Sequence, residues 1–288
     1  MDADPADHIA GHPEDPLTVA VVQFGPHTDI DANLAALTER VRSAAARGAR
    51  VVVAPEYSMF ALGRLDDRVF AAAQPLDGPF VTALAGLAAE TGVHLVAGVV
   101  ETTEPEDGRI HNTLVALGPD GALLTHYRKV HLYDAFGQRE SEVVRPGPLA
   151  DPALFTAGGF TFGLQTCFDL RFPEGFRRLA ATGAQVLLLP AQWIPGPGKV
   201  DQWTTLLRAR AIENTVFLAA ADQCGPRGAG ASMIIDPAGR VLAELGDEPG
   251  VALARLEPEV LAEVRRANPS LALRRFSVEV PEASSVGG

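Results

Sequence analysis

A thiol and several charged groups lie close together near the middle of the chain. Cys167 ends an apolar run and is followed within seven positions by Asp169, Arg171 and Glu174. The pattern predicts a strand, a tight turn and then a helix. A thiol at such a turn lies near backbone N–H groups and a helix N-terminus, which lower the pKa of a thiol. Most unpaired cysteines are small core residues, but a core residue needs no charged neighbours, so the segment favours a nucleophile.

Two further charged residues lie at the ends of apolar strands. Glu56 ends the run VVVAPE, and Lys129 lies near the end of LLTHYRKVHL. Catalytic groups gather at the carboxyl ends of strands, and a carboxylate held against apolar surface has the raised pKa that a general base needs. The alternative for Glu56 is a solvated carboxylate. Arg128 and Lys129 point to opposite faces of a strand, so they cannot share one role, and the spacing does not say which is solvated.

The histidines and cysteines disfavour a metal site and a disulfide framework. His126 and His131 are five apart, which places them on opposite faces of a strand. This separation disfavours both a metal pair and a simple Cys–His dyad from this strand. Cys167 and Cys224 are the only cysteines, so the sequence predicts no cysteine-rich zinc site and indicates a reducing, cytoplasmic setting.

Composition limits the class of protein. The chain has 288 residues, 47% hydrophobic and 21% charged, with a net charge of −12. These are ordinary globular values, and the negative charge argues against a nucleic-acid or anionic-membrane partner. No apolar run is long enough to span a membrane. We expect a disordered acidic leader over residues 1–16, one domain over residues 17–281 and a loose tail over residues 282–288.

Strands and helices alternate in both halves of the chain. The expected strands cover residues 18–24, 50–55, 93–100, 111–116, 121–127, 160–164, 184–190, 216–221, 231–236, 240–245 and 251–256. The expected helices cover about 31–45, 79–90, 175–183, 200–214 and 257–266, and a long loop is expected over 134–152. No linker divides the halves, which favours one domain with two sheets packed face to face and helices outside.

Four segments closely resemble the motifs of the nitrilase superfamily, the carbon–nitrogen hydrolases. They are VVVAPEY, HYRKVHLYD, GLQTCFDLRFPE and WTTLLRARAIEN, and they occur in the family's order. The resemblance runs from about residue 18 to residue 280. The residues of these motifs are most similar to those of the Nit branch, which includes omega-amidase and deaminated glutathione amidase. It implies an α/β fold, the four-layer α-β-β-α sandwich, and a homodimer.

The resemblance also implies a role for each matching residue. Cys167 is the expected nucleophile, Glu56 the general base and Lys129 the cation at the developing oxyanion. The backbone N–H of Phe168 is the expected second oxyanion donor, and Glu140 is expected to position the site. This chemistry is amide hydrolysis through a thioester, for which no metal or organic cofactor is expected.

The expected substrate is a small linear amide. A nitrile or a carbamoyl group would need the same three residues, and a non-catalytic, partner-binding homologue is a further alternative. We expect a carboxylate at the far end of the substrate, held by Arg171; alternatively, Arg171 pairs locally with Asp169 or Glu174. The apolar walls of the pocket are expected from three aromatic residues, Tyr133, Phe136 and Trp193.

Overall fold

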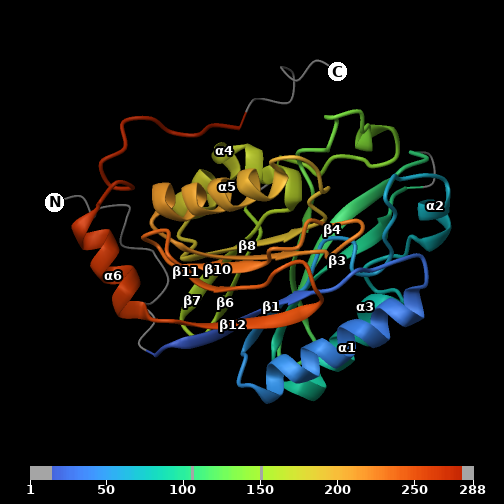
Figure 1. Cartoon of the computed structure of the whole chain (residues 1–288), viewed down its shortest axis with the longest axis horizontal. Helices are drawn as coiled ribbons and strands as arrows, with labels where there is room; N and C mark the ends of the chain where they lie inside the picture. The colour runs from blue at the N-terminus through green and yellow to red at the C-terminus, as the bar shows by residue number, and fades with distance from the viewer. Residues whose placement is uncertain (1–14, 105–106, 150–151, 281–288) are drawn as a thin grey trace.

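Two six-stranded sheets pack face to face, with helices over both outer faces (Figure 1). The computed structural model describes residues 15–104, 107–149 and 152–280. The arrangement confirms the expected four-layer α-β-β-α sandwich. The expected leader lies outside the described residues except for its last two positions, and the expected tail lies wholly outside them.

The first sheet is built from the strands of the N-terminal half of the chain and from β12, the last strand of the chain. Its order is β12 (Gly250–Leu256), β1 (Leu17–Gln23), β2 (Val51–Val53), β3 (His94–Thr102), β4 (Ile110–Leu117) and β5 (Leu123–Arg128). The central strands β1, β2 and β3 are parallel. Their connections contain α1 (Ile30–Ala46), α2 (Arg68–Ala72) and α3 (Pro79–Thr91). Parallel strands need such crossovers, which explains the helices on the outer face.

The second sheet repeats this plan with the C-terminal half. Its order is β11 (Val241–Glu244), β10 (Met233–Ile235), β9 (Phe217–Asp222), β8 (Val186–Ala191), β7 (Phe160–Leu164) and β6 (Leu154–Ala157). Strands β7, β8 and β9 are parallel. Helices α4 (Pro173–Ala181) and α5 (Lys199–Asn214) connect them, and α6 (Pro258–Ala267) lies at one end of the sandwich (Figure 1).

Three apolar layers hold the sandwich together. Val19 and Val21 of β1 belong to the cluster between the sheets, whereas Ala20 and Val22 belong to the cluster shared with α1 and α3. The third layer lies between the second sheet, α4 and α5. Because both faces of the central strands are buried, these strands are continuous apolar runs without polar alternation. That is the pattern by which the sequence predicted them.

Three short elements were not predicted, and strand β6 is the first of them. The hairpin of β6 and β7 turns at Gly158 and Gly159, which have φ angles of 54° and 79°. Two adjacent residues with positive φ make the tight turn of a two-residue hairpin, for which Gly-Gly is a known signal. Helix α2 was also not predicted, and the expected loop over residues 134–152 contains the 3-10 helix Glu140–Glu142.

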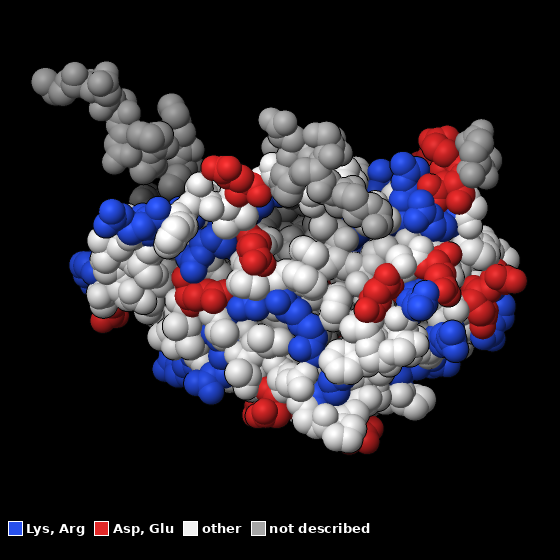
Figure 2. All heavy atoms as spheres, turned by 90° about the horizontal axis from the view of Figure 1, so that it is seen from above, with Lys and Arg blue, Asp and Glu red and all other residues white. Residues whose placement is uncertain are grey.

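The outer surface carries mixed charge. Figure 2 shows the face seen from above in Figure 1, where basic and acidic side chains are interspersed among uncharged ones. A nucleic-acid-binding face instead gathers Lys and Arg into a continuous patch or stripe. Among the described residues, no helix is long and apolar enough to cross a membrane.

Candidate active site

Side chains from both sheets meet in one small pocket. Glu56 lies three residues beyond β2, and Lys129 follows β5 directly. Cys167 lies just beyond β7, and Gln192 follows β8. All four line a pocket of about 110 Å³. The predicted nucleophile, base and cation are therefore brought together where the ends of strands from the two sheets meet.

A buried ammonium lies between two buried carboxylates. Lys129 Nζ is 2.8 Å from Glu56 Oε1 and 2.9 Å from Glu140 Oε2, and all three side chains are at least 90% buried. Burial alone would lower the pKa of Lys129, but the carboxylates of Glu140 and Glu56 outweigh it and raise this pKa well above its usual value. Lys129 therefore stays charged at the centre of the site.

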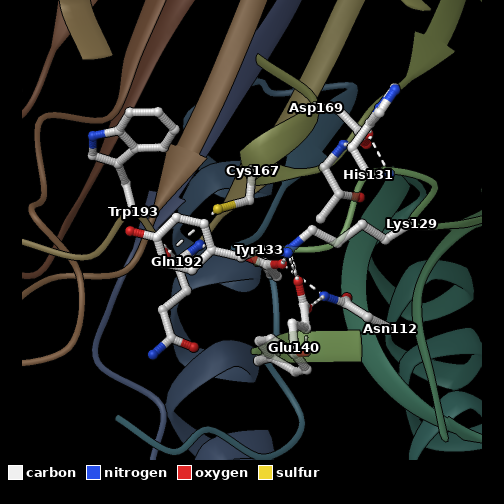
Figure 3. A network of polar contacts seen from close by, with 12 residues as sticks. Asn112, Lys129, His131, Tyr133, Glu140, Cys167, Asp169, Gln192 and Trp193 are labelled. Carbon is white, nitrogen blue, oxygen red and sulfur yellow. Dashed lines mark hydrogen bonds and ion pairs between the residues drawn. The ribbon is translucent and has the colours of Figure 1, made fainter. Parts of the chain in front are cut away.

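Neutral donors fix the orientation of the two carboxylates. Asn112 on β4 donates to Glu56 Oε1 at 2.7 Å and to Glu140 Oε1 at 3.1 Å (Figure 3). The Tyr57 hydroxyl donates to Glu140 Oε1 at 2.9 Å, and the backbone N–H of Tyr133 donates to Glu140 Oε2 at 2.6 Å. Because hydrogen-bonded buried carboxylates have little freedom to rotate, the cluster is preorganised.

The thiol of Cys167 lies beside this cluster and points toward the backbone of Gln192 (Figure 3). Its Sγ donates to the carbonyl of Gln192 at 3.6 Å, and the N–H of Gln192 donates to Glu56 Oε2 at 2.7 Å. Burial raises the pKa of Cys167 well above its usual value, and the charge of Glu56 raises it further, although Lys129 opposes them. The expectation of a lowered thiol pKa is therefore wrong, because burial and a neighbouring carboxylate outweigh the turn. The thiol stays protonated until a base removes the proton.

The turn that carries Cys167 is tightly held. Cys167 has a φ of 44°, and it begins the 3-10 helix Cys167–Arg171. Asp169 and Thr166 form a capping box at its start. The fully buried carboxylate of Asp169 also accepts from the Tyr127 hydroxyl at 2.8 Å and from His131 Nδ1 at 2.7 Å. These bonds tie the nucleophile's turn to the segment that carries Lys129.

Helix α5 supports the same turn from outside. Buried Arg210 donates to the carbonyl of Leu170 from Nε at 3.1 Å and from Nη2 at 2.8 Å. It also pairs with Glu213, three residues along the same helix, at 3.0 Å. Leu170 is three residues after the nucleophile, so Arg210 is a positioning residue that acts through the backbone of this turn.

Only part of the predicted substrate-binding set lines the pocket. Tyr133 and Trp193 do so, and so does Phe168, the expected oxyanion donor. Phe136 is 68% exposed and does not, and neither does Arg171. The guanidinium of Arg171 donates to Gln202 at 2.7 Å and forms no ion pair with Asp169 or Glu174 among the described residues, so the alternative of local pairing is wrong. Asp169 is already engaged inside the turn, which leaves Arg171 on the outer side.

Four residues of the site were not predicted. Asn112, Tyr57 and Gln192 contact the catalytic groups, and Lys199 lines the pocket. A polar residue inside a fully buried strand signals Asn112, and Tyr57 directly follows Glu56. Lys199 gave no signal, because it follows a Gly- and Pro-rich loop where position cannot be inferred. No group of three or more His, Cys, Asp or Glu side chains that could hold a metal occurs among the described residues.

Comparison with known proteins agrees with this geometry. The family model described as carbon–nitrogen hydrolase matches residues 18–266. Deaminated glutathione amidase of Escherichia coli O157:H7 is 36% identical over 262 residues, covering 91% of this chain and 98% of the relative. The crystal structure of the C. elegans NitFhit protein superimposes with a TM-score of 0.85 at 28% identity, covering 97% of this chain and 70% of that one.

A third similar protein has an active-site cysteine that is modified by acrylamide. It is a mutant amidase from Nesterenkonia sp. AN1, whose structure shows the Michael addition of acrylamide at the active-site cysteine. It has a TM-score of 0.72 and 30% identity, and the match covers 87% of this chain and 99% of that one. The match to the family model spans both sheets and every group of the pocket described above. The chain therefore belongs to the carbon–nitrogen hydrolase family.

Proposed function

We propose that this protein hydrolyses the C–N bond of a small linear amide and releases ammonia, with Cys167, Glu56 and Lys129 as its catalytic residues. The observation that carries the proposal is the convergence of a thiol, a carboxylate and an ammonium in one small pocket. Glu56 contacts Lys129 directly and contacts the segment at the thiol through the backbone of Gln192.

The first half of the reaction forms a thioester. Glu56 takes the proton of Cys167, and the thiolate attacks the amide carbon. The negative charge that develops on the amide oxygen is met by the ammonium of Lys129 and the backbone N–H of Phe168, each worth on the order of 3 kcal/mol. An ammonium has three N–H donors, and Glu56 and Glu140 engage two of those of Lys129. One donor remains for the oxyanion.

The second half restores the enzyme. Protonated Glu56 gives its proton to the departing nitrogen, the C–N bond breaks, and ammonia leaves. Glu56 then removes a proton from water, whose oxygen attacks the thioester carbon. The C–S bond breaks, the thiolate regains the proton from Glu56, and a carboxylic acid is released. Glu140 keeps Lys129 and Glu56 in place throughout this cycle through the contacts given above.

An omega-amide of a short dicarboxylic acid is the substrate class that we favour. The small pocket suits a small ligand. The E. coli relative is named deaminated glutathione amidase, which makes an amide the favoured substrate. A nitrile or carbamoyl substrate would use the same groups, and a non-catalytic, partner-binding role is a further alternative.

The test is ammonia release from matched compounds. Purified protein is given a panel of short amides, with the nitrile and the carbamoyl compound of equal chain length, and the acid product is identified by mass spectrometry. We expect ammonia and acid from the amides, with only trace product from nitriles. Faster turnover of the nitrile or carbamoyl compound would reassign the substrate class. The absence of turnover on the whole panel, together with no labelling of Cys167 by acrylamide, would favour the non-catalytic alternative.

We further propose a homodimer in a reducing, cytoplasmic setting. Both cysteines are free thiols, which suits such a compartment. Helix α5 exposes Val200 and Ile212, each more than 40% accessible, on the outer face of the second sheet. We expect α4 and α5 to meet their copies across a two-fold axis. Light scattering at micromolar concentration should give twice the monomer mass, and a monomer alone would contradict the dimer.

A further inference from the structure

A second cluster of charge lies at the pocket, away from the catalytic carboxylates. Lys199 is the first residue of α5, and its half-buried side chain lines the pocket. Its Nζ donates to the Tyr133 hydroxyl at 3.2 Å and lies 4.1 Å from the centre of the Phe136 ring and 5.2 Å from that of Trp193. Aromatic faces attract a cation but leave its charge uncompensated.

Arg171 brings a second positive charge to the same aromatic rings. Its guanidinium carbon lies 4.9 Å from the centre of the Trp193 ring and 5.5 Å from that of Phe136. Its Nη2 donates to a neutral amide, that of Gln202, and its buried Nε has no hydrogen-bond partner among the described residues. Burial lowers the pKa of Lys199, and the charge of Arg171 lowers it further. The two cations therefore repel each other across shared rings.

No acid balances this pair. In the part of the chain that the structure describes, neither Lys199 nor Arg171 forms an ion pair with a carboxylate. This is unexpected in a chain with 36 acidic and only 24 basic residues. Two partly desolvated cations without a counter-charge are costly to keep together. A bound anion would remove that cost, so the cluster has the properties of an empty anion site.

We propose that Lys199 and Arg171, with the Tyr133 hydroxyl, form a subsite for the carboxylate at the far end of the substrate from the amide. This inference rests on the proposed amide hydrolysis. It places Lys199 at the pocket wall as the direct contact and Arg171 behind it. Lys199 supplies the compact charge, and Arg171 adds a second donor fork suited to a carboxylate.

Tyr133 links this subsite to the reacting groups. Its backbone N–H donates to Glu140, its ring packs edge-on against Phe168 at 5.0 Å between centres, and its hydroxyl accepts from Lys199. One tyrosine side chain therefore separates the catalytic cluster from the subsite. A short linear chain between amide and carboxylate would lie along Tyr133, which suits a monoamide of a short dicarboxylic acid.

The test compares glutaramate with butanamide, its neutral counterpart of similar length. The measured quantity is the ratio of their kcat/KM values, from ammonia release, in wild type and in Lys199→Met. Removing a charged hydrogen bond should lower this ratio by roughly tenfold to a hundredfold. Lys199→Arg, which keeps the charge, should restore much of the preference. Arg208→Met removes an exposed charge from the same helix and should leave the ratio as in wild type.

Binding of the product gives a second, independent readout. Glutarate, titrated calorimetrically, should bind wild type and bind Lys199→Met roughly tenfold or more weakly. An unchanged ratio in folded Lys199→Met, or equal loss on both amides, would overturn the subsite. If wild type cleaves no amide, the proposed hydrolysis fails, and glutarate binding still decides the subsite on its own. Equal glutarate affinity in wild type and in Lys199→Met would then refute it.

Discussion

The catalytic cluster and the outer wall of the pocket, formed by Lys199 with Arg171 behind it, differ in how their charges are balanced. In the catalytic cluster, the ammonium of Lys129 is compensated by Glu56 and Glu140, and neutral donors fill the remaining positions of the carboxylates. On the outer wall, Lys199, with Arg171 behind it, has aromatic and amide neighbours, and neither cation pairs with an acid among the described residues. The first region is complete before a ligand arrives. The second becomes complete only when an anion binds.

This difference separates two tasks. Preorganised, balanced charge stabilises a transition state without moving, which is the largest contribution to catalysis in many enzymes. Unbalanced charge is a cost to the free protein that a ligand of opposite sign relieves, and so it discriminates between substrates. Variants of the catalytic cluster should therefore lower turnover of every substrate. Variants of the outer wall should change which substrate is preferred.

The largest expected effect comes from the nucleophile. Cys167→Ala should reduce kcat by about 10⁴-fold or more for acidic and neutral amides alike, because no other group can form the thioester. Cys224→Ala is the matched control, since Cys224 is also a buried free thiol but does not line the pocket. It should keep near-wild-type turnover. Ammonia release measures both, and substantial activity in a folded Cys167→Ala protein would end the assignment.

The base and the oxyanion cation come next. Glu56→Gln should lower kcat by about 10²- to 10⁴-fold, because an amide cannot accept the thiol proton. Lys129→Arg keeps the charge, but its planar guanidinium does not fit between two carboxylates placed for a compact ammonium, so we expect a loss of about 10²- to 10³-fold. Steady-state kinetics on both amide classes should show equal losses. Wild-type turnover by Lys129→Arg would contradict the oxyanion role.

The state of the thiol gives a third, pH-dependent test. Because burial and Glu56 raise the pKa of Cys167 above the usual 9.0, the resting thiol should be protonated at neutral pH and ionise only at more alkaline pH. Iodoacetamide labelling in a Cys224→Ala background should therefore have its midpoint above pH 9. Glu56→Gln removes a negative charge that favours the protonated thiol, so its midpoint should move to lower pH. A midpoint that stays unchanged or moves upward would show that the charge of Glu56 does not raise the pKa of this thiol.

The smallest expected effect lies on the outer wall. Tyr133→Phe removes only the hydroxyl that accepts from Lys199 and keeps both the backbone bond to Glu140 and the packing on Phe168. Losing one such bond should raise KM for glutaramate by about two- to tenfold. The value of kcat should change little, and KM for butanamide should not follow. A large fall in kcat would place the hydroxyl in the catalytic cluster instead.

The fold was predictable because buried parallel strands are continuous apolar runs with recognisable ends. The runs at β1, β2 and β8 lie within a few residues of their expected positions. Strand β6 was not predicted, because a four-residue strand has too short a pattern to identify. Helix α2 is similarly short.

Within the site, strand ends and the family resemblance together located Glu56, Lys129 and Cys167. The polar network around them could not be predicted, because the partners of Glu140 come from three separate segments of the chain. The direction of the pKa shift of Cys167 was also predicted wrongly, because the burial of the thiol is a property of the folded chain. Lys199 shows the same limit most clearly. The aromatic residues around it are distant in the sequence and come close to it only in the folded chain.

Helix α5 reaches the site at both of its ends. Near its end it holds the nucleophile's turn through Arg210, and at its start it places Lys199 at the pocket. A hydrogen-bonded helix has a fixed rise per residue and does not stretch. It therefore fixes the distance between the sulfur of Cys167 and the proposed carboxylate subsite. In a homologous series of monoamides, the rate should be highest at one chain length and fall on either side, because this distance cannot change to fit a shorter or longer substrate.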